Sequence, residues 1–141
     1  MRNAIDNTAN LKDKLEGLEG LLADSRVTID EATAIEFEES TGLGPCGAIS
    51  MAVRELTGMP IAMVWVGNIR IGYAHYLNVT SHGTLVDFSP LETGVKIQYS
   101  VLEILPNNIN PELYTITDTK LVKTATINAL KKAGYLMEVR K

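Results

Sequence analysis

The sequence predicts an α+β protein in which helices, one of them carrying the only cysteine, pack on an antiparallel sheet. Apolar residues recur at helical spacing near residues 11–22, 46–56 and 121–133, and they alternate with polar residues over 71–79 and 95–101. The chain has 141 residues, with no internal repeat and no linker rich in Pro, Gly or Ser. We therefore expect a single domain over residues 1–141.

Composition and charge exclude several classes of protein. The formal net charge is −4 and no basic cluster occurs, which argues against a protein that binds nucleic acid by neutralising phosphates. Residues 1–10 lack the apolar core of a signal peptide, and the longest apolar run, 61–66, is too short to cross a membrane. A single cysteine excludes an intrachain disulfide. We expect a cytoplasmic protein with no nucleic-acid or membrane partner. Delivery elsewhere without a classical signal peptide would leave no recognisable signal in the sequence.

Two helices are expected ahead of the cysteine. The first, over residues 11–22, has an apolar stripe that could pack on the core or dock a partner. Thr28 and Glu31 have the spacing of a capping box, which predicts a second helix running to about Ser40. The acidic residues of this second helix lack a histidine at helical spacing, so we interpret them as a solvated face rather than a metal site. They are Glu36, Glu38 and Glu39.

The cysteine lies at the predicted start of the next helix. Gly44 can cap this helix, and Pro45 suits its first position, where a missing N–H is not needed. Apolar residues at helical spacing follow as far as Leu56, and Gly58 with Pro60 ends the helix. Cys46 therefore falls in the first turn, where unpaired N–H groups and the helix dipole favour a thiolate. A lone cysteine can equally be a small buried hydrophobe.

Strands are predicted after this helix. Residues 61–66 form a continuous apolar run typical of a central strand covered on both faces. Alternation over 71–79 places His75 among apolar neighbours on one face of the next strand. A three-residue loop ending in a left-handed Gly83 leads to a strand over 84–88. Because this loop has an odd length, His75 and Asp87 should lie on the same face of adjacent strands.

The last third of the chain is predicted to add strands and one helix. A half-exposed strand is expected over 95–101 and a short one over 113–117. A helix should begin at Asp118 or Thr119 and end at Gly134, and a final strand is expected over 135–139.

Cys46, His75 and Asp87 together suit nucleophilic catalysis. A thiolate nucleophile needs a base within hydrogen-bond reach, and that base needs a third group that fixes its tautomer and stabilises the imidazolium. Taken singly, the position of His75 indicates a core histidine, and that of Asp87 indicates a cap at the end of a strand. A thiol at a helix start, followed by a histidine and an aspartate facing the same way on neighbouring strands, favours a catalytic triad.

The motifs around these residues resemble a known group of enzymes. Gly44-Pro45-Cys46-Gly47, Ala74-His75-Tyr76 and the segment 84–88 are similar to the core of papain-like and transglutaminase-like thiol enzymes, most of all the short domains of bacterial and phage proteins. The resemblance covers residues 42–90. It implies a papain-like or transglutaminase-like fold, with Cys46 as nucleophile, His75 as general base and Asp87 as the orienting residue.

One feature departs from the papain-like pattern. Those proteases place a glutamine that donates to the oxyanion several residues before the cysteine, but residues 38–41 contain none and the only glutamine is Gln98. The backbone N–H of Cys46 is one candidate donor. The sequence does not identify the second.

The expected function is therefore thiol-dependent acyl transfer at an amide or ester carbonyl. A cysteine peptidase or amidase acting on a peptide, a protein or a small amide or ester is the leading interpretation. A protein deamidase, a transglutaminase or an acyltransferase would use the same triad, and an inactive binding or inhibitor domain would keep the same fold. An assembly protein that docks through residues 11–22 is a third class, and nothing in the sequence indicates an oligomeric state.

No cofactor or metal ion is expected. His82 lies in a polar turn and should be exposed. Cys46, His75, His82 and Asp87 lack the paired ligands at short spacing that structural zinc sites favour.

Overall fold

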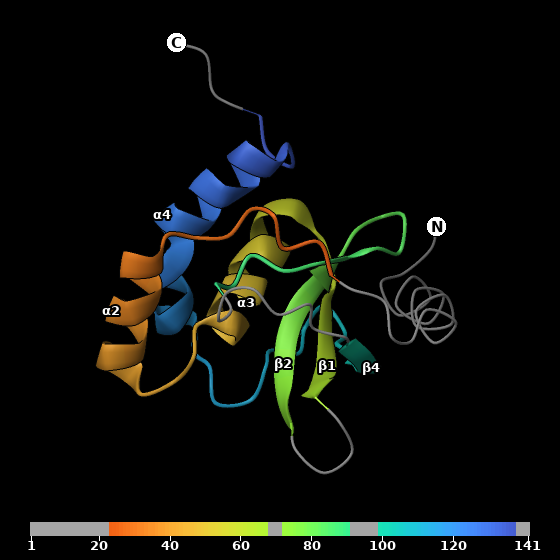
Figure 1. Cartoon of the computed structure of the whole chain (residues 1–141), viewed down its shortest axis with the longest axis horizontal. Coiled ribbons are helices and arrows are strands. Elements are labelled where there is room, and N and C mark those ends of the chain that lie inside the picture. Colours follow the sequence, from red (N-terminus) through yellow and green to blue (C-terminus); the bar gives the residue numbers. More distant parts are fainter. Residues whose placement is uncertain (1–22, 68–71, 91–98, 138–141) are drawn as a thin grey trace.

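A computed structural model describes residues 23–67, 72–90 and 99–137 of the chain (Figure 1). Its helices and its antiparallel sheet confirm the α+β class. The strand order is β3-β2-β1-β4. The helices are α2 (Glu31–Thr41), α3 (Cys46–Thr57) and α4 (Ile116–Ala133), and the strands are β1 (Ile61–Gly67), β2 (Gly72–Val79), β3 (Leu85–Val86) and β4 (Tyr99–Ile104).

The cysteine helix α3 lies between the sheet and α4 (Figure 1). Ala48, Ile49, Ala52 and Val53 are almost fully buried, as their spacing predicted. Gly58 ends the helix in the left-handed conformation, with φ of 80°, and donates to the carbonyl of Arg54. The start is shifted by one residue, because Pro45 is the cap and Cys46 the first helical residue.

The sheet curls, and its two faces pack differently. One face of β1 packs with β2 and β3 in a cluster that includes Val64, Leu77 and Leu85. On the other face Ile61 is buried but Met63 and Trp65 are only half-buried, so the prediction of a strand covered on both faces holds in part. The register pairs Val64 with His75, which places the histidine on the face of that apolar cluster.

The β2–β3 hairpin turns at Gly83, whose φ is 80° as predicted. The strand that follows is shorter than predicted, because it leaves the ladder after Val86. Asp87 then donates its N–H to the carbonyl of Asp24, and the carbonyl of Phe88 accepts from Ile29. The segment after β3 is thus paired with the chain ahead of α2.

Three predicted elements differ from the structure. The cap of α2 is Asp30, which accepts from the N–H of Thr33, so the predicted capping box of Thr28 and Glu31 is wrong. Residues 113–115 lie in a loop and α4 begins at Ile116, capped by Thr115 and Asp118 in a capping box, so the short strand over 113–117 is wrong. Residues 135–137 are not a strand.

Other predictions fall outside the described residues. They are the helix over 11–22, the strand residues 95–98 and the end of the final strand at 138–139. Within the described ranges, none of the helices has the length and apolar character needed to span a bilayer.

The cap of α2 gives a first testable prediction. Replacing Asp30 with Ala removes the acceptor for the Thr33 N–H and hydroxyl, so the free energy of unfolding should fall by about 1 kcal/mol in a urea titration. Thr28→Ala is the control and should cost less, because the Thr28 hydroxyl bonds only the carbonyl of Ile29. A larger loss for Thr28→Ala would restore the capping box that the sequence predicted.

Candidate active site

Cys46 is the first residue of α3, so its thiol lies at the positive end of the helix dipole. Ser50, one turn along, donates its hydroxyl to the carbonyls of Cys46 at 2.8 Å and Gly47 at 3.0 Å, which braces this turn. Cys46 itself is partly buried. A thiol in this position is shielded from bulk water but keeps a path to it.

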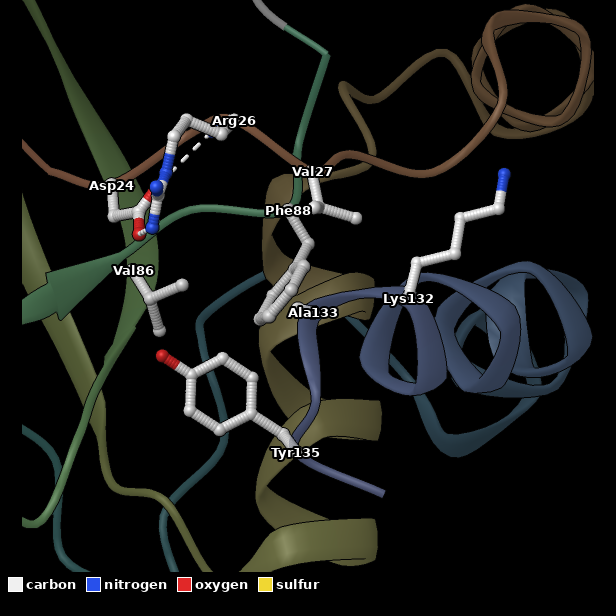
Figure 2. A pocket seen from close by; sticks show the side chains of 8 residues that line it. All are labelled: Asp24, Arg26, Val27, Val86, Phe88, Lys132, Ala133 and Tyr135. Atoms are coloured by element: carbon white, nitrogen blue, oxygen red, sulfur yellow. Dashed lines mark hydrogen bonds and ion pairs between the residues drawn. The ribbon is translucent and has the colours of Figure 1, made fainter. Parts of the chain in front are cut away.

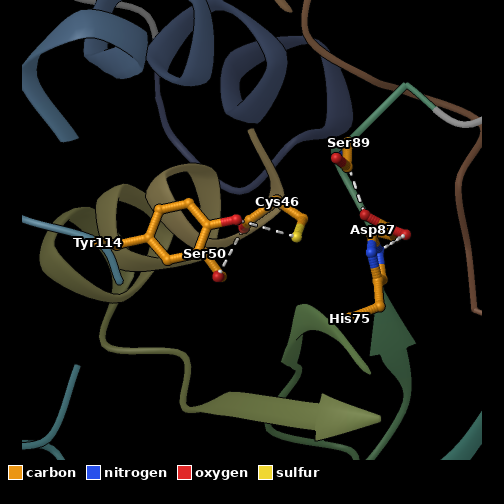
Figure 3. Close-up of polar contacts among 6 residues, drawn as sticks. All are labelled: Cys46, Ser50, His75, Asp87, Ser89 and Tyr114. Atoms are coloured by element: carbon orange, nitrogen blue, oxygen red, sulfur yellow. Dashed lines mark hydrogen bonds and ion pairs between the residues drawn. The ribbon is translucent and has the colours of Figure 1, made fainter. Parts of the chain in front are cut away.

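His75 and Asp87 form a buried pair across β2 and the end of β3. Nε2 of His75 lies 2.7 Å from Oδ2 of Asp87, and the two side chains are 3% and 1% exposed. The second carboxylate oxygen, Oδ1, accepts from the backbone N–H of Ser89 at 2.9 Å (Figure 3). Both oxygens therefore have donors, and the carboxylate cannot turn without losing one of them. The structure thus brings together the two residues that the odd hairpin loop was expected to align.

The thiol joins this pair from the helix. Figure 3 shows the sulfur between the Tyr114 hydroxyl and the His75–Asp87 pair. The His75 ring and the backbone of Tyr76 both act on the Cys46 thiol and lower its pKa. β3 pairs with β2 only at Asn78 and Val79. The edge of β2 at Tyr76 is therefore open to the start of α3. Nε2 is the ring nitrogen of His75 that bonds Asp87.

Burial and charge act in opposite directions on these two groups. Burial raises the pKa of the Cys46 thiol, but the hydrogen bond and the charge of His75 outweigh it, so the pKa falls below its ordinary value. Burial lowers the pKa of His75, but its bonds to Asp87 and Cys46 raise the pKa to about 10. Both shifts favour a thiolate beside an imidazolium at neutral pH.

Asn78 fixes the helix against the histidine strand. This fully buried side chain on β2 donates through Nδ2 to the carbonyl of Ser50 on α3 at 3.1 Å. The same amide lies 3.2 Å from the carbonyl of Met59 and 3.4 Å from that of Pro60. The distance between Cys46 and His75 is therefore set by a polar anchor three residues along the same strand.

The remaining candidate residues lie apart from this site. His82 is exposed in the hairpin turn, and Glu36, Glu38 and Glu39 are exposed on α2. Within residues 23–67, 72–90 and 99–137, no group of three or more His, Cys, Asp or Glu side chains is placed to hold a metal ion.

A pocket lies between the segment after β3 and the end of α4 (Figure 2). Phe88 and Tyr135 pack edge to face there, with ring centroids 6.1 Å apart, beside the ion pair of Asp24 and Arg26. None of the residues that line it belongs to the Cys46–His75–Asp87 site.

Tyr114 is the site residue that sequence reasoning missed. Its hydroxyl donates to the carbonyl of Gly44 at 2.8 Å and lies 3.7 Å from Sγ of Cys46. We interpreted this residue as part of a strand, but the capping box of Thr115 and Asp118 places it in the loop just before α4. That Thr-x-x-Asp spacing was the available signal, because it sets the start of the helix one turn before the predicted start.

Comparison with known proteins adds no relative: no family model, curated protein or solved structure matches this chain.

The electrostatics predict how stability depends on pH. The folded pKa of His75, about 10, lies above its ordinary value of 6.5, so the stability it contributes is complete below about pH 6.5 and is lost as pH rises toward 10. We propose to measure this pH dependence of stability in Cys46→Ala protein, where no thiol is present to titrate. The loss of unfolding free energy caused by adding Asp87→Asn should be largest near pH 6 and should shrink as pH rises above about 6.5.

The matched control for this experiment is Cys46→Ala with His82→Ala, because His82 is exposed and remote from Asp87. A difference between the Asp87 variants that stays constant from about pH 6 to about pH 9 would contradict a charged His75–Asp87 pair.

Proposed function

We propose that this protein is a thiol-dependent acyl-transfer enzyme, and that it acts as a cysteine peptidase or amidase. The observation that carries the proposal is the almost fully buried pair of His75 and Asp87, which lies beside the Cys46 thiol at the start of α3. His75 lowers the pKa of that thiol. A buried charged pair costs desolvation free energy, so its presence beside a thiol is better explained by chemistry than by stability. The resemblance of residues 42–90 to papain-like and transglutaminase-like enzymes supports the same roles.

The reaction follows from these roles. The Cys46 thiolate attacks the carbonyl carbon of an amide or ester, and the carbonyl π pair moves to oxygen. When the tetrahedral intermediate collapses, the C–N or C–O bond breaks and His75 gives its proton to the leaving group. Neutral His75 then takes a proton from water, the resulting hydroxide attacks the thioester, and the carboxylic acid and thiolate are released. Asp87 keeps the ring oriented throughout.

The same acyl-enzyme can be resolved by an amine instead of water. A deamidase, a transglutaminase and an acyltransferase differ from a peptidase in the leaving group or in the second nucleophile, not in the first step. Acylation of Cys46 is therefore the step to test first.

We propose p-nitrophenyl acetate as the probe. Wild-type protein should release a burst of nitrophenolate equal to about one per chain, with a mass increase of one acetyl group on the peptide that contains Cys46. Cys46→Ala should abolish the burst. Asp87→Asn should slow it by about 10²-fold or more, because the imidazolium loses its charge partner and the wrong tautomer becomes available.

His82→Ala is the matched control for histidine substitution, since His82 is exposed and outside the site. Its burst should equal that of the wild type. A folded wild-type protein that gives no burst, or a burst that survives in Cys46→Ala, would reject the proposed function.

A further inference from the structure

The hydroxyl of Tyr114 stands where a tetrahedral intermediate on Cys46 needs a hydrogen-bond donor. It comes from the loop before α4 and lies 3.7 Å from Sγ, on the other side of the sulfur from His75 (Figure 3). Resting on the proposed function, we propose that Tyr114 is a further catalytic residue, whose hydroxyl and the backbone N–H of Cys46 together form the oxyanion hole. This assigns the second donor that the sequence leaves unidentified.

The two sides of the sulfur suit the two needs of the reaction. His75 must reach the leaving group in order to protonate it, while the oxyanion needs donors that point away from that proton transfer. With His75 on one side and Tyr114 on the other, an attacked carbonyl can direct its leaving group to the imidazole and its oxygen to the phenol. Cys46 is the first helical residue, so its N–H has no partner within the helix and is also available.

The donor is held in place before any substrate arrives. The Tyr114 ring covers Gly47 so closely that a β-carbon at Gly47 would overlap it. It also packs edge to face on Tyr76, with centroids 6.1 Å apart. Arg54 of α3 holds the preceding loop through the carbonyl of Ile109 at 2.6 Å. The hydroxyl oxygen is thus fixed beside the sulfur, and only the O–H hydrogen has to turn when charge develops.

The hydroxyl also keeps its proton. Burial and the charge of Cys46 raise the pKa of Tyr114 well above its ordinary value, so the phenol is neutral wherever the thiolate forms. At rest it donates to the carbonyl of Gly44. When the thiolate adds to a carbonyl, the Tyr114 O–H rotates and donates to the oxyanion instead of to Gly44. The proton stays on the phenol throughout. When the intermediate collapses, the hydroxyl donates to the Gly44 carbonyl again.

Two reactions of the same sulfur separate this role from others. Acylation by p-nitrophenyl acetate develops an oxyanion, whereas alkylation by iodoacetamide displaces iodide at a saturated carbon and develops none. Tyr114→Phe keeps the ring and removes only the hydroxyl. At the pH plateau of each reaction, where Cys46 is fully ionised, acylation should slow by about 10²-fold or more while alkylation changes by less than about threefold.

Gly47→Ala is a second variant that keeps the hydroxyl but displaces the ring, and it should show the same selective loss. Tyr135→Phe is the matched control, because it removes a tyrosine hydroxyl at the pocket of Figure 2 and should leave both rates unchanged. Melting temperatures of all three variants show whether each is folded.

The outcomes are distinguishable. Selective loss of acylation in folded Tyr114→Phe supports the donor role. If Tyr114→Phe does not fold, the same selective loss in folded Gly47→Ala supports it. Equal rates in wild type and folded Tyr114→Phe, a rise in both rates, or an equal fall in both overturn it and leave the proposed function standing, because wild type is still acylated. If wild type gives no nitrophenolate burst, both the proposed function and this role are rejected.

Discussion

The hydrogen bond between His75 Nε2 and Asp87 Oδ2 is the interaction on which the site depends. It puts an ionisable pair where both side chains are almost fully removed from water, a placement that costs several kcal/mol per ion unless every polar atom finds a partner. Partners are present on both sides: Ser89 donates to the second carboxylate oxygen, and Asp87 and Cys46 together raise the pKa of the ring. Among the described residues, no buried side-chain nitrogen or oxygen lacks a hydrogen-bond partner.

The rest of the fold holds this pair against the thiol. Asp87, the first residue after β3, is held by the bond of its own N–H to the carbonyl of Asp24. Asn78 ties α3 to β2, and Arg54 ties the same helix to the loop that carries Tyr114. The nucleophile helix is thus connected by polar contacts to both sides of the site, and not by apolar packing alone. A site held this way keeps its geometry in the resting state.

Local signals were enough to predict much of this arrangement. Gly58 and Gly83 occupy left-handed positions that favour glycine. The end of α3 and the hairpin turn could therefore be predicted from these two residues. The odd loop length then brought His75 and Asp87 to one face. The start of α2 was ambiguous, because Thr28 and Asp30 are both good caps and the choice between them depends on tertiary context.

What could not be predicted depends on contacts distant in sequence. β3 pairs with β2 only as far as Val86, while the chain before α2 bonds its other edge through Asp24. Tyr114 reaches the thiol only because a loop beyond β4 folds back over Gly47, and 68 residues separate the two partners of that contact. No spacing rule reports such a juxtaposition. The family resemblance could not supply it either, since its pattern calls for a glutamine donor before the cysteine.

The proposed reaction needs a thiolate and an imidazolium that exist together at neutral pH, and the thiolate absorbs in the far ultraviolet where the thiol does not. The most direct test is therefore the difference in absorbance between wild-type and Cys46→Ala protein, followed as a function of pH, with the His75→Ala protein treated in the same way. The thiolate signal of wild type should persist well below pH ~8.5, the pKa of an unperturbed cysteine, and loss of His75 should move its appearance to that value or above. A wild-type transition at pH ~8.5 that His75→Ala leaves in place would show that the two groups do not form a pair.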